Sequence, residues 1–165
     1  MPSPRISQEL KNEIYFVTLT IQKWYYLFDR HDRWEILLKA LRYYQKNNDL
    51  KIYAWVFMIN HIHLIFQIED SVDFLRSFKS YTSHQLKDDL LLTEPDVLRL
   101  FKFKDGYHIW RNKNFPELIQ TEDFFYQKVK YVEENPVKKS YVYNPEDWKY
   151  SSANVIQLLN VTRFE

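Results

Sequence analysis

Residues 51–68 read KIYAWVFMINHIHLIFQI, and the arrangement of the other elements follows from this stretch. Residues 51–58 are nearly all apolar, which predicts a buried β-strand. Ile59 and Asn60 mark a tight turn, and residues 61–68 have the composition of a second strand. Two strands that meet through so short a turn favour an antiparallel sheet.

The two histidines of this stretch lie on one face of the second strand. Side chains alternate between the faces of a strand, so the apolar residues at positions 62, 64, 66 and 68 face the core. His61 and His63 then project together from the other, less apolar face, with Cβ atoms about 6–7 Å apart. Two imidazoles at that spacing can converge on one divalent metal. A chance pair with one histidine packed in the core is the alternative. The pair also does not identify the third ligand that a metal needs.

Hydrophobic periodicity and capping residues predict the remaining elements. Asp32 is expected to cap a helix to residue 47, and Asp70 or Ser71 a helix to about residue 90. Thr121 is expected to cap a third helix that ends at residue 135, just before Pro136. A loop is expected around residues 93–95, a short helix at 151–159, and further strands at 14–21, 107–110, 115–119 and 141–143. These elements predict an α+β fold, an antiparallel sheet covered by helices.

The composition limits the class of protein. The chain has 165 residues, which fits one domain over residues 1–165 with a core from about 12 to 152. It has no cysteine, so disulfides and thiolate metal sites are excluded. No apolar run is long enough to span a membrane, and residues 1–10 lack the apolar segment of a secretory signal. We therefore expect a cytoplasmic location and no membrane partner.

Basic residues gather locally, although the formal net charge is only +1. One group at 99–113 is interleaved with aromatic residues, another lies at 128–139, and Lys79 is on the polar face of the second predicted helix. Cations among aromatic rings suit single-stranded nucleic acid, whose bases stack and whose phosphates need positive charge. An ordinary solvated surface is the alternative. The candidate nucleic-acid contacts are Lys79, Lys102, Lys104, Arg111, Lys113 and Lys128.

The third predicted helix presents a tyrosine away from its apolar stripe. Phe125, Val129 and Val132 form that stripe, and Tyr131 is rotated by about 100° from Val132. Asn135 shares the face of Tyr131, and Lys128 borders it. A phenol in this position could attack a phosphodiester that a divalent metal polarises. The chain has 13 tyrosines, most of which must have packing or surface roles, and Tyr126 is the other candidate on this helix.

Three segments together resemble the HUH-type single-tyrosine transposases, and most closely the REP-associated tyrosine transposases. Residues 54–64, AWVFMINHIHL, resemble the HUH motif region. Residues 131–138, YVEENPVK, resemble the tyrosine helix, and residues 148–152, WKYSS, resemble a C-terminal signature of this family. The resemblance extends from about residue 14 to residue 152. Arg111, Asn112 and Lys113 depart from the usual pattern, so the resemblance does not transfer a substrate preference.

The resemblance implies a ferredoxin-like HUH endonuclease fold and a transposase that cuts single-stranded DNA near hairpins. It implies that His61, His63 and Asn135 hold Mg²⁺ or Mn²⁺, and that Tyr131 attacks a DNA phosphate. The products would be a 5′-phosphotyrosine link and a free 3′-hydroxyl. Relatives occur as monomers and as homodimers. A domesticated module that binds hairpin DNA without cutting it, or an RNA-binding protein on a related scaffold, are the alternative functions.

Overall fold

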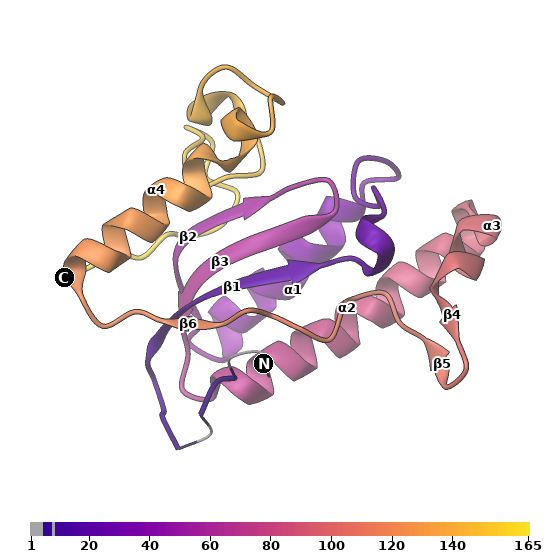
Figure 1. The fold of residues 1–165 in the computed structure, drawn as a ribbon, viewed down its shortest axis with the longest axis horizontal. Coiled ribbons are helices and arrows are strands. Elements are labelled where there is room, and N and C mark those ends of the chain that lie inside the picture. Colours follow the sequence, from indigo (N-terminus) through magenta and orange to yellow (C-terminus); the bar gives the residue numbers. More distant parts are fainter. Residues whose placement is uncertain (1–4, 8) are drawn as a thin grey trace.

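A computed structural model describes residues 5–7 and 9–165 of the chain. Residues 1–4 and 8, which belong to the segment considered above for a secretory signal, lie outside the described residues. The main sheet has the order β2-β3-β1-β6, and every neighbouring pair is antiparallel (Figure 1). Its strands are β1 (Ile14–Thr20), β2 (Lys51–Phe57), β3 (His61–Gln67) and β6 (Glu117–Leu118).

Two helices cover one face of the sheet and form the larger hydrophobic cluster with it. They are α1 (Arg33–Asn47) and α2 (Ser71–Thr93). The apolar residues that β3 turns toward them, Ile62, Leu64 and Phe66, are fully buried, as the alternation of the sequence predicted. The order of elements β1-α1-β2-β3-α2-β6 and this strand order are those of a ferredoxin-like fold. The predicted α+β architecture is therefore confirmed.

The helix α4 (Glu122–Lys138) lies across the opposite face of the sheet (Figure 1). Phe125 and Val132 from this helix pack with Val56 of β2 and Ile65 of β3 in a second, smaller cluster. The predicted face of His61 and His63 is therefore not solvated along its whole length, because α4 covers much of it. α4 thus lies over the strand that carries the histidines.

The predicted helix boundaries are partly wrong. Asp70 and Thr121 cap their helices as expected, because their side chains accept hydrogen bonds from the backbone N–H groups of Asp73 and Phe124. Asp32 has a left-handed backbone and no side-chain cap bond. α4 continues through Pro136 to Lys138. A proline in the last turn removes only one helical hydrogen bond.

Several short elements also differ from the prediction. The loop predicted at residues 93–95 is reduced to Glu94, a single non-helical residue between α2 and α3 (Pro95–Leu98), which is followed by η2 (Arg99–Phe101). Residues 107–110 do not form one strand. Tyr107 ends β5 (Gly106–Tyr107), which pairs with β4 (Lys102–Phe103), and Trp110 forms an isolated bridge with Ile21. Two further 3-10 helices, η1 (Gln22–Trp24) and η3 (Pro145–Asp147), were not predicted.

The predicted strand at 141–143 and helix at 151–159 are absent. The chain instead runs along the free edge of β2. Ser151 forms an isolated bridge with Val56, and the backbone N–H of Ser152 donates to the carbonyl of Trp55 at 2.9 Å. These bonds to the sheet replace the bonds that a local helix would make. None of the helices in the described part of the chain is both long and apolar enough to cross a membrane.

A buried arginine joins α1 to the C-terminal end of α2. Arg33 is fully buried, and its guanidinium contacts Asp89 at 2.7 Å and Glu94 at 2.6 Å. It also donates to the backbone carbonyl of Leu27 at 3.0 Å. Burial acts to raise the pKa of Glu94, but its hydrogen bonds with Arg30 and Arg33 leave that pKa below the usual value.

We expect Arg33→Met to lower the free energy of unfolding by about 3 kcal/mol, because it leaves two carboxylates without a buried partner. Urea denaturation at pH 7 measures this change, and Arg76→Met, which removes an exposed ion pair with Asp73, is the matched control with an effect below about 1 kcal/mol. Glu94 has a lowered folded-state pKa, so its stabilising contribution is present above pH 4.5 and is lost below it. Arg33→Met should reduce this acid-dependent loss. Equal effects of the two substitutions would contradict the assignment.

Candidate active site

Each of the two histidines is oriented by a contact at its Nδ1 atom. His63 lies opposite Thr18 in the pairing of β3 with β1, and the Thr18 hydroxyl is 2.9 Å from His63 Nδ1. His61 Nδ1 is 2.7 Å from the side-chain oxygen of Asn60, an acceptor to which it donates. The Nε2 atom of His61 therefore carries the lone pair. Contacts of this kind orient histidine ligands toward a metal.

Burial and nearby cations keep both imidazoles neutral. The pKa of His61 is lowered to about 4 by burial and by Lys139. The pKa of His63 is lowered to about 3 by burial, by His61 and by Lys128 and Lys139. Neutral imidazoles have the lone pair that a metal needs, so no proton must be displaced near pH 7.

Asn135 reaches the same place from α4. It is only 5% exposed, and its amide nitrogen is 3.4 Å from His63 Nε2. Its side-chain oxygen is buried and has no hydrogen-bond partner. The side chain that carries this unpartnered oxygen lies against His63, so the residues present fit a hard divalent cation that takes oxygen and nitrogen ligands. Among the described residues no three histidine, cysteine or acidic side chains cluster for a metal, so any site here depends on the asparagine.

Tyr131 lies next to His63 on the exposed side of α4. Its ring centroid is 5.4 Å from that of His63 and 5.8 Å from that of Phe16, and the residue is 38% exposed. Tyr126, the alternative candidate, packs instead against Phe125 and Phe164. Of the two tyrosines, Tyr131 is the one that the fold brings to the histidines.

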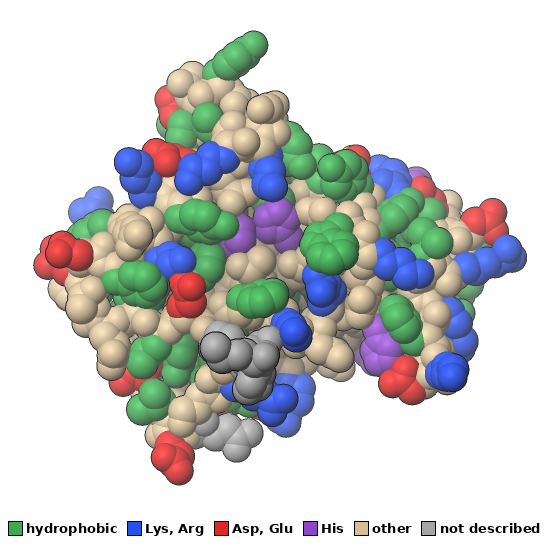
Figure 2. Space-filling model, viewed as in Figure 1, with side chains coloured by type: hydrophobic (Ala, Val, Ile, Leu, Met, Phe, Trp, Pro, Cys, Tyr) green, Lys and Arg blue, Asp and Glu red, His purple; other side chains and the backbone are tan. Residues whose placement is uncertain are grey.

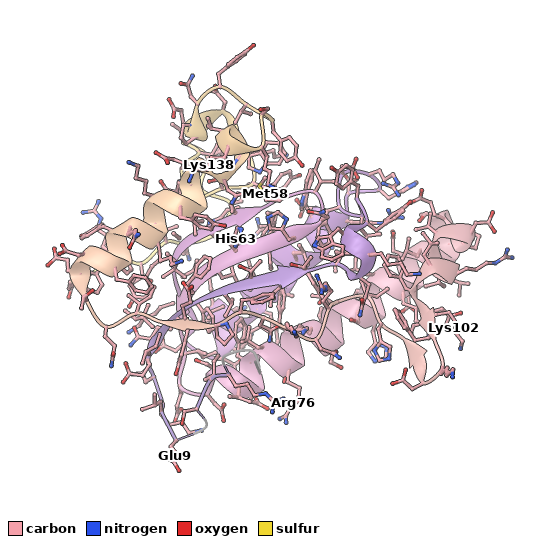
Figure 3. The ribbon with its side chains drawn as sticks, in the orientation of Figure 1. Glu9, Met58, His63, Arg76, Lys102 and Lys138 are labelled. Atoms are coloured by element: carbon pink, nitrogen blue, oxygen red, sulfur yellow. The ribbon has the colours of Figure 1, made fainter. Side chains whose placement is uncertain are left out.

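Lysines surround the tyrosine. The ammonium groups of Lys128 and Lys138 are each 5.3 Å from the centre of the Tyr131 ring, although Lys128 is also paired with Glu117 at 2.6 Å. Figure 3 shows His63 on the sheet and Lys138 at the C-terminal end of α4. Cations around a phenol and two neutral imidazoles form an environment suited to a phosphate group.

Two residues that orient the histidines, Thr18 and Asn60, were not predicted as part of the site. Thr18 is the residue of β1 that lies opposite His63, but this is visible only once the pairing of the strands is known. Asn60 was interpreted as a turn residue only. Its side chain also donates to the backbone carbonyl of Trp24 at 3.0 Å, so it connects His61 to a neighbouring loop.

The C-terminal segment holds α4 in place. Trp148 donates from its indole N–H to the carbonyl of Phe57 at 2.9 Å and stacks on Tyr141. Ser152 donates to the Glu133 carboxylate of α4 at 3.1 Å. Burial raises the pKa of Glu133, and this hydrogen bond acts in the opposite direction. Residues 148–152 therefore have a visible structural role next to the tyrosine helix.

The candidate nucleic-acid contacts fall into separate places. Lys79 is used internally, since its ammonium donates to the carbonyl of Arg111 at 2.7 Å and to Asn114 at 2.9 Å, and burial lowers its pKa to about 8. Lys102 lies at the far end of the molecule from His63 (Figure 3), and Lys104 is in the same hairpin. Arg111 stacks on Trp24, and Lys113 is exposed in the following loop.

The surface around the histidines combines apolar and basic groups. Figure 2 shows histidine near the centre of this face, with hydrophobic and basic side chains on several sides of it. The structure therefore brings His61, His63, Asn135, Tyr131 and Lys128 together. It does not bring Lys102 or Lys104 to the same place.

Comparison with known proteins identifies a family and a similar fold. A family model described as IS200-like transposase matches residues 10–124, which include both histidines but end before Tyr131. The comparison with curated proteins found no match. In the solved structure of a REP-associated tyrosine transposase bound to a REP hairpin, 82% of that chain aligns with 92% of this one, at 21% identity and a TM-score of 0.71. A protein from Deinococcus radiodurans R1 described as a candidate transposase is 16% identical, with a TM-score of 0.48 over 81% of this chain and 97% of its own.

The first of these structures supports the fold assignment, and the family model covers more than half of the chain. The match to the family model includes the histidine strand and the helices α1 and α2 on one face of the sheet. The chain belongs to the family of IS200-like transposases.

Proposed function

We propose that this transposase is a metal-dependent endonuclease and strand transferase that cuts single-stranded DNA beside hairpins, with Tyr131 as the nucleophile. The observation that carries the proposal is the meeting of Tyr131 and Asn135 from α4 with His63 from β3. A module that only binds DNA has no need of a partly exposed phenol beside two neutral, oriented imidazoles.

His61, His63 and Asn135 would hold Mg²⁺ or Mn²⁺ through two imidazole nitrogens and one amide oxygen. When bound, the metal supplies positive charge that polarises the scissile phosphate. Thr18 and Asn60 keep the two rings in position. Lys138 and Lys128, close to the Tyr131 ring, offset the charge of the phosphate as the phenol approaches.

The proposed step exchanges one phosphate ester for another. The Tyr131 oxygen forms a bond to phosphorus and loses its proton, while the bond from phosphorus to the 3′ oxygen breaks. The 3′ oxygen takes up a proton and leaves as a free hydroxyl, and the 5′ phosphate stays on the tyrosine. A DNA hydroxyl can later attack this ester and rejoin strands without ATP, because the bond energy is kept.

Hairpin DNA is the proposed partner, because the structurally similar tyrosine transposase is bound to a REP hairpin. Tyr131 already lies beside His63 of its own chain, so the proposed chemistry does not require a second subunit. Residues 1–165 would act as one transposase domain in the cytoplasm. The basic residues Arg111, Lys113 and Lys128 are the proposed DNA contacts nearest the site, whereas Lys102 and Lys104 would contact a more distant part of the substrate.

Tyr131→Phe should abolish covalent protein–DNA adducts and leave binding of single-stranded DNA within about threefold, because it removes only the attacking oxygen. Labelled hairpin-flanked strands are incubated with Mn²⁺ and resolved on a denaturing gel. Tyr126→Phe, on the same helix and 52% exposed, is the matched control and should keep full adduct formation. Adducts that persist in Tyr131→Phe would reject Tyr131 as nucleophile. Tight binding without adducts in the unmodified protein would favour a non-cleaving binding module.

His63→Ala should eliminate measurable Mn²⁺ binding in isothermal titration calorimetry, because it removes a proposed ligand. Thr18→Val keeps the shape of the side chain but removes the hydroxyl beside His63 Nδ1, so it should weaken Mn²⁺ binding about 10–100-fold. His84→Ala, at an exposed position of α2, should leave the affinity unchanged. If His63→Ala folds and still binds Mn²⁺ with the original affinity, the metal site lies elsewhere.

A further inference from the structure

Trp24 is an exposed tryptophan close to the candidate active site. It is 60% exposed, whereas Trp55 and Trp110 are buried. Within the described residues, it is absent from both hydrophobic clusters. A large aromatic ring is therefore kept at the surface without a role in the core.

The backbone around Trp24 is fixed in an uncommon conformation. Lys23 and Trp24 have φ angles of 60° and 51°, a region that residues other than glycine rarely adopt. The turn is held by the Trp24 N–H, which donates to the carbonyl of Ile21 at 3.1 Å, and by the Asn60 side chain, which donates to the carbonyl of Trp24 at 3.0 Å. Because the oxygen of the same Asn60 side chain contacts His61, one residue connects this turn to the proposed metal ligand.

Arg111 covers one face of the indole. Its guanidinium carbon is 4.3 Å from the centre of the Trp24 ring. No ion pair of Arg111 with an acidic residue occurs in the described part of the chain. Its charge is therefore available to a ligand. A cation stacked on an exposed aromatic ring is a recurrent arrangement in sites for single-stranded nucleic acid.

The arginine lies on the same side of the sheet as the histidines. The Arg111 N–H donates to the carbonyl of Thr20 at 2.8 Å, and Thr20 lies opposite His61 in the strand pairing. Trp110, the preceding residue, points into the core on the other face. Two strand spacings separate Arg111 from His61, which is roughly 10 Å.

We propose that Trp24 and Arg111 form a platform that binds one unpaired base of single-stranded DNA, a few nucleotides from the phosphate at Tyr131. The base stacks on the face of the indole that Arg111 leaves free, and the guanidinium pairs with a neighbouring phosphate. This proposal rests on the proposed function, which identifies single-stranded DNA as the substrate. The platform explains how the strand is held relative to the nucleophile.

The test separates base stacking from phosphate binding. All proteins carry Tyr131→Phe and are kept in EDTA, so neither cleavage nor metal contributes. Fluorescence anisotropy measures binding of two labelled probes, a strand of twenty thymidines and a strand of twenty abasic units, which has the same phosphates without bases. The parent protein should bind the thymidine strand at least about fivefold more tightly, as expected for one base–aromatic stack.

Trp24→Ala should remove most of this preference by weakening the thymidine strand about fivefold or more, with little change for the abasic strand. Trp24→Phe, which restores an aromatic ring, should recover much of the preference. Tyr143→Ala is the matched control, because Tyr143 is 95% exposed in the loop after α4 and should not affect either probe. Full retention of the preference in Trp24→Ala, or an equal loss for both probes, would overturn the platform.

These outcomes are independent of the chemistry at Tyr131. If the unmodified protein forms no adducts but Trp24→Ala loses base preference, the platform stands and the proposed cleavage fails. If adducts form normally and Trp24→Ala keeps its base preference, the cleavage stands and the platform fails.

Discussion

The packing of α4 on the second face of the sheet is the contact on which the candidate site depends. Phe125 and Val132 of α4 are buried against Val56 and Ile65. Because side chains leave a helix at intervals of about 100°, burial of these residues fixes the direction of every other side chain on α4. Tyr131 is thereby directed to the rim of the helix beside His63. If this apolar contact were lost, the tyrosine would be an ordinary surface residue.

The same packing explains the electrostatics of the site. α4 excludes water from His63, which is 3% exposed, and Lys128 and Lys139 add positive charge. Both effects oppose protonation of the imidazoles. The site thus combines neutral imidazole nitrogens with nearby lysine ammonium groups. A formal net charge of +1 conceals this local field, because acidic residues elsewhere cancel it.

Much of this arrangement follows from local sequence, since parity within one strand places His61 and His63 together and the apolar stripe of one helix turns Tyr131 away from it. Alternation and periodicity depend only on neighbouring residues, so these predictions were correct. The contacts that join distant segments were not predictable in this way. Arg33 reaches Asp89 across 56 residues, and Ser151 to Ser152 bind the edge of β2 in place of forming a helix. Such contacts depend on which surfaces the fold brings together.

The chain accepts backbone strain at several residues, although it has almost no glycine. Gly106 is its only glycine, yet eight other described residues have positive φ angles. Asn12 and Asp49 are types that tolerate this conformation, whereas Lys23 and Trp24 are not, and each such residue costs on the order of 1–3 kcal/mol. Glycine at position 24 would relieve the strain but would remove the indole. The chain nevertheless keeps tryptophan at this position, where Asn60 connects the backbone carbonyl of Trp24 to the histidine strand. The indole therefore has a role other than stabilising the fold.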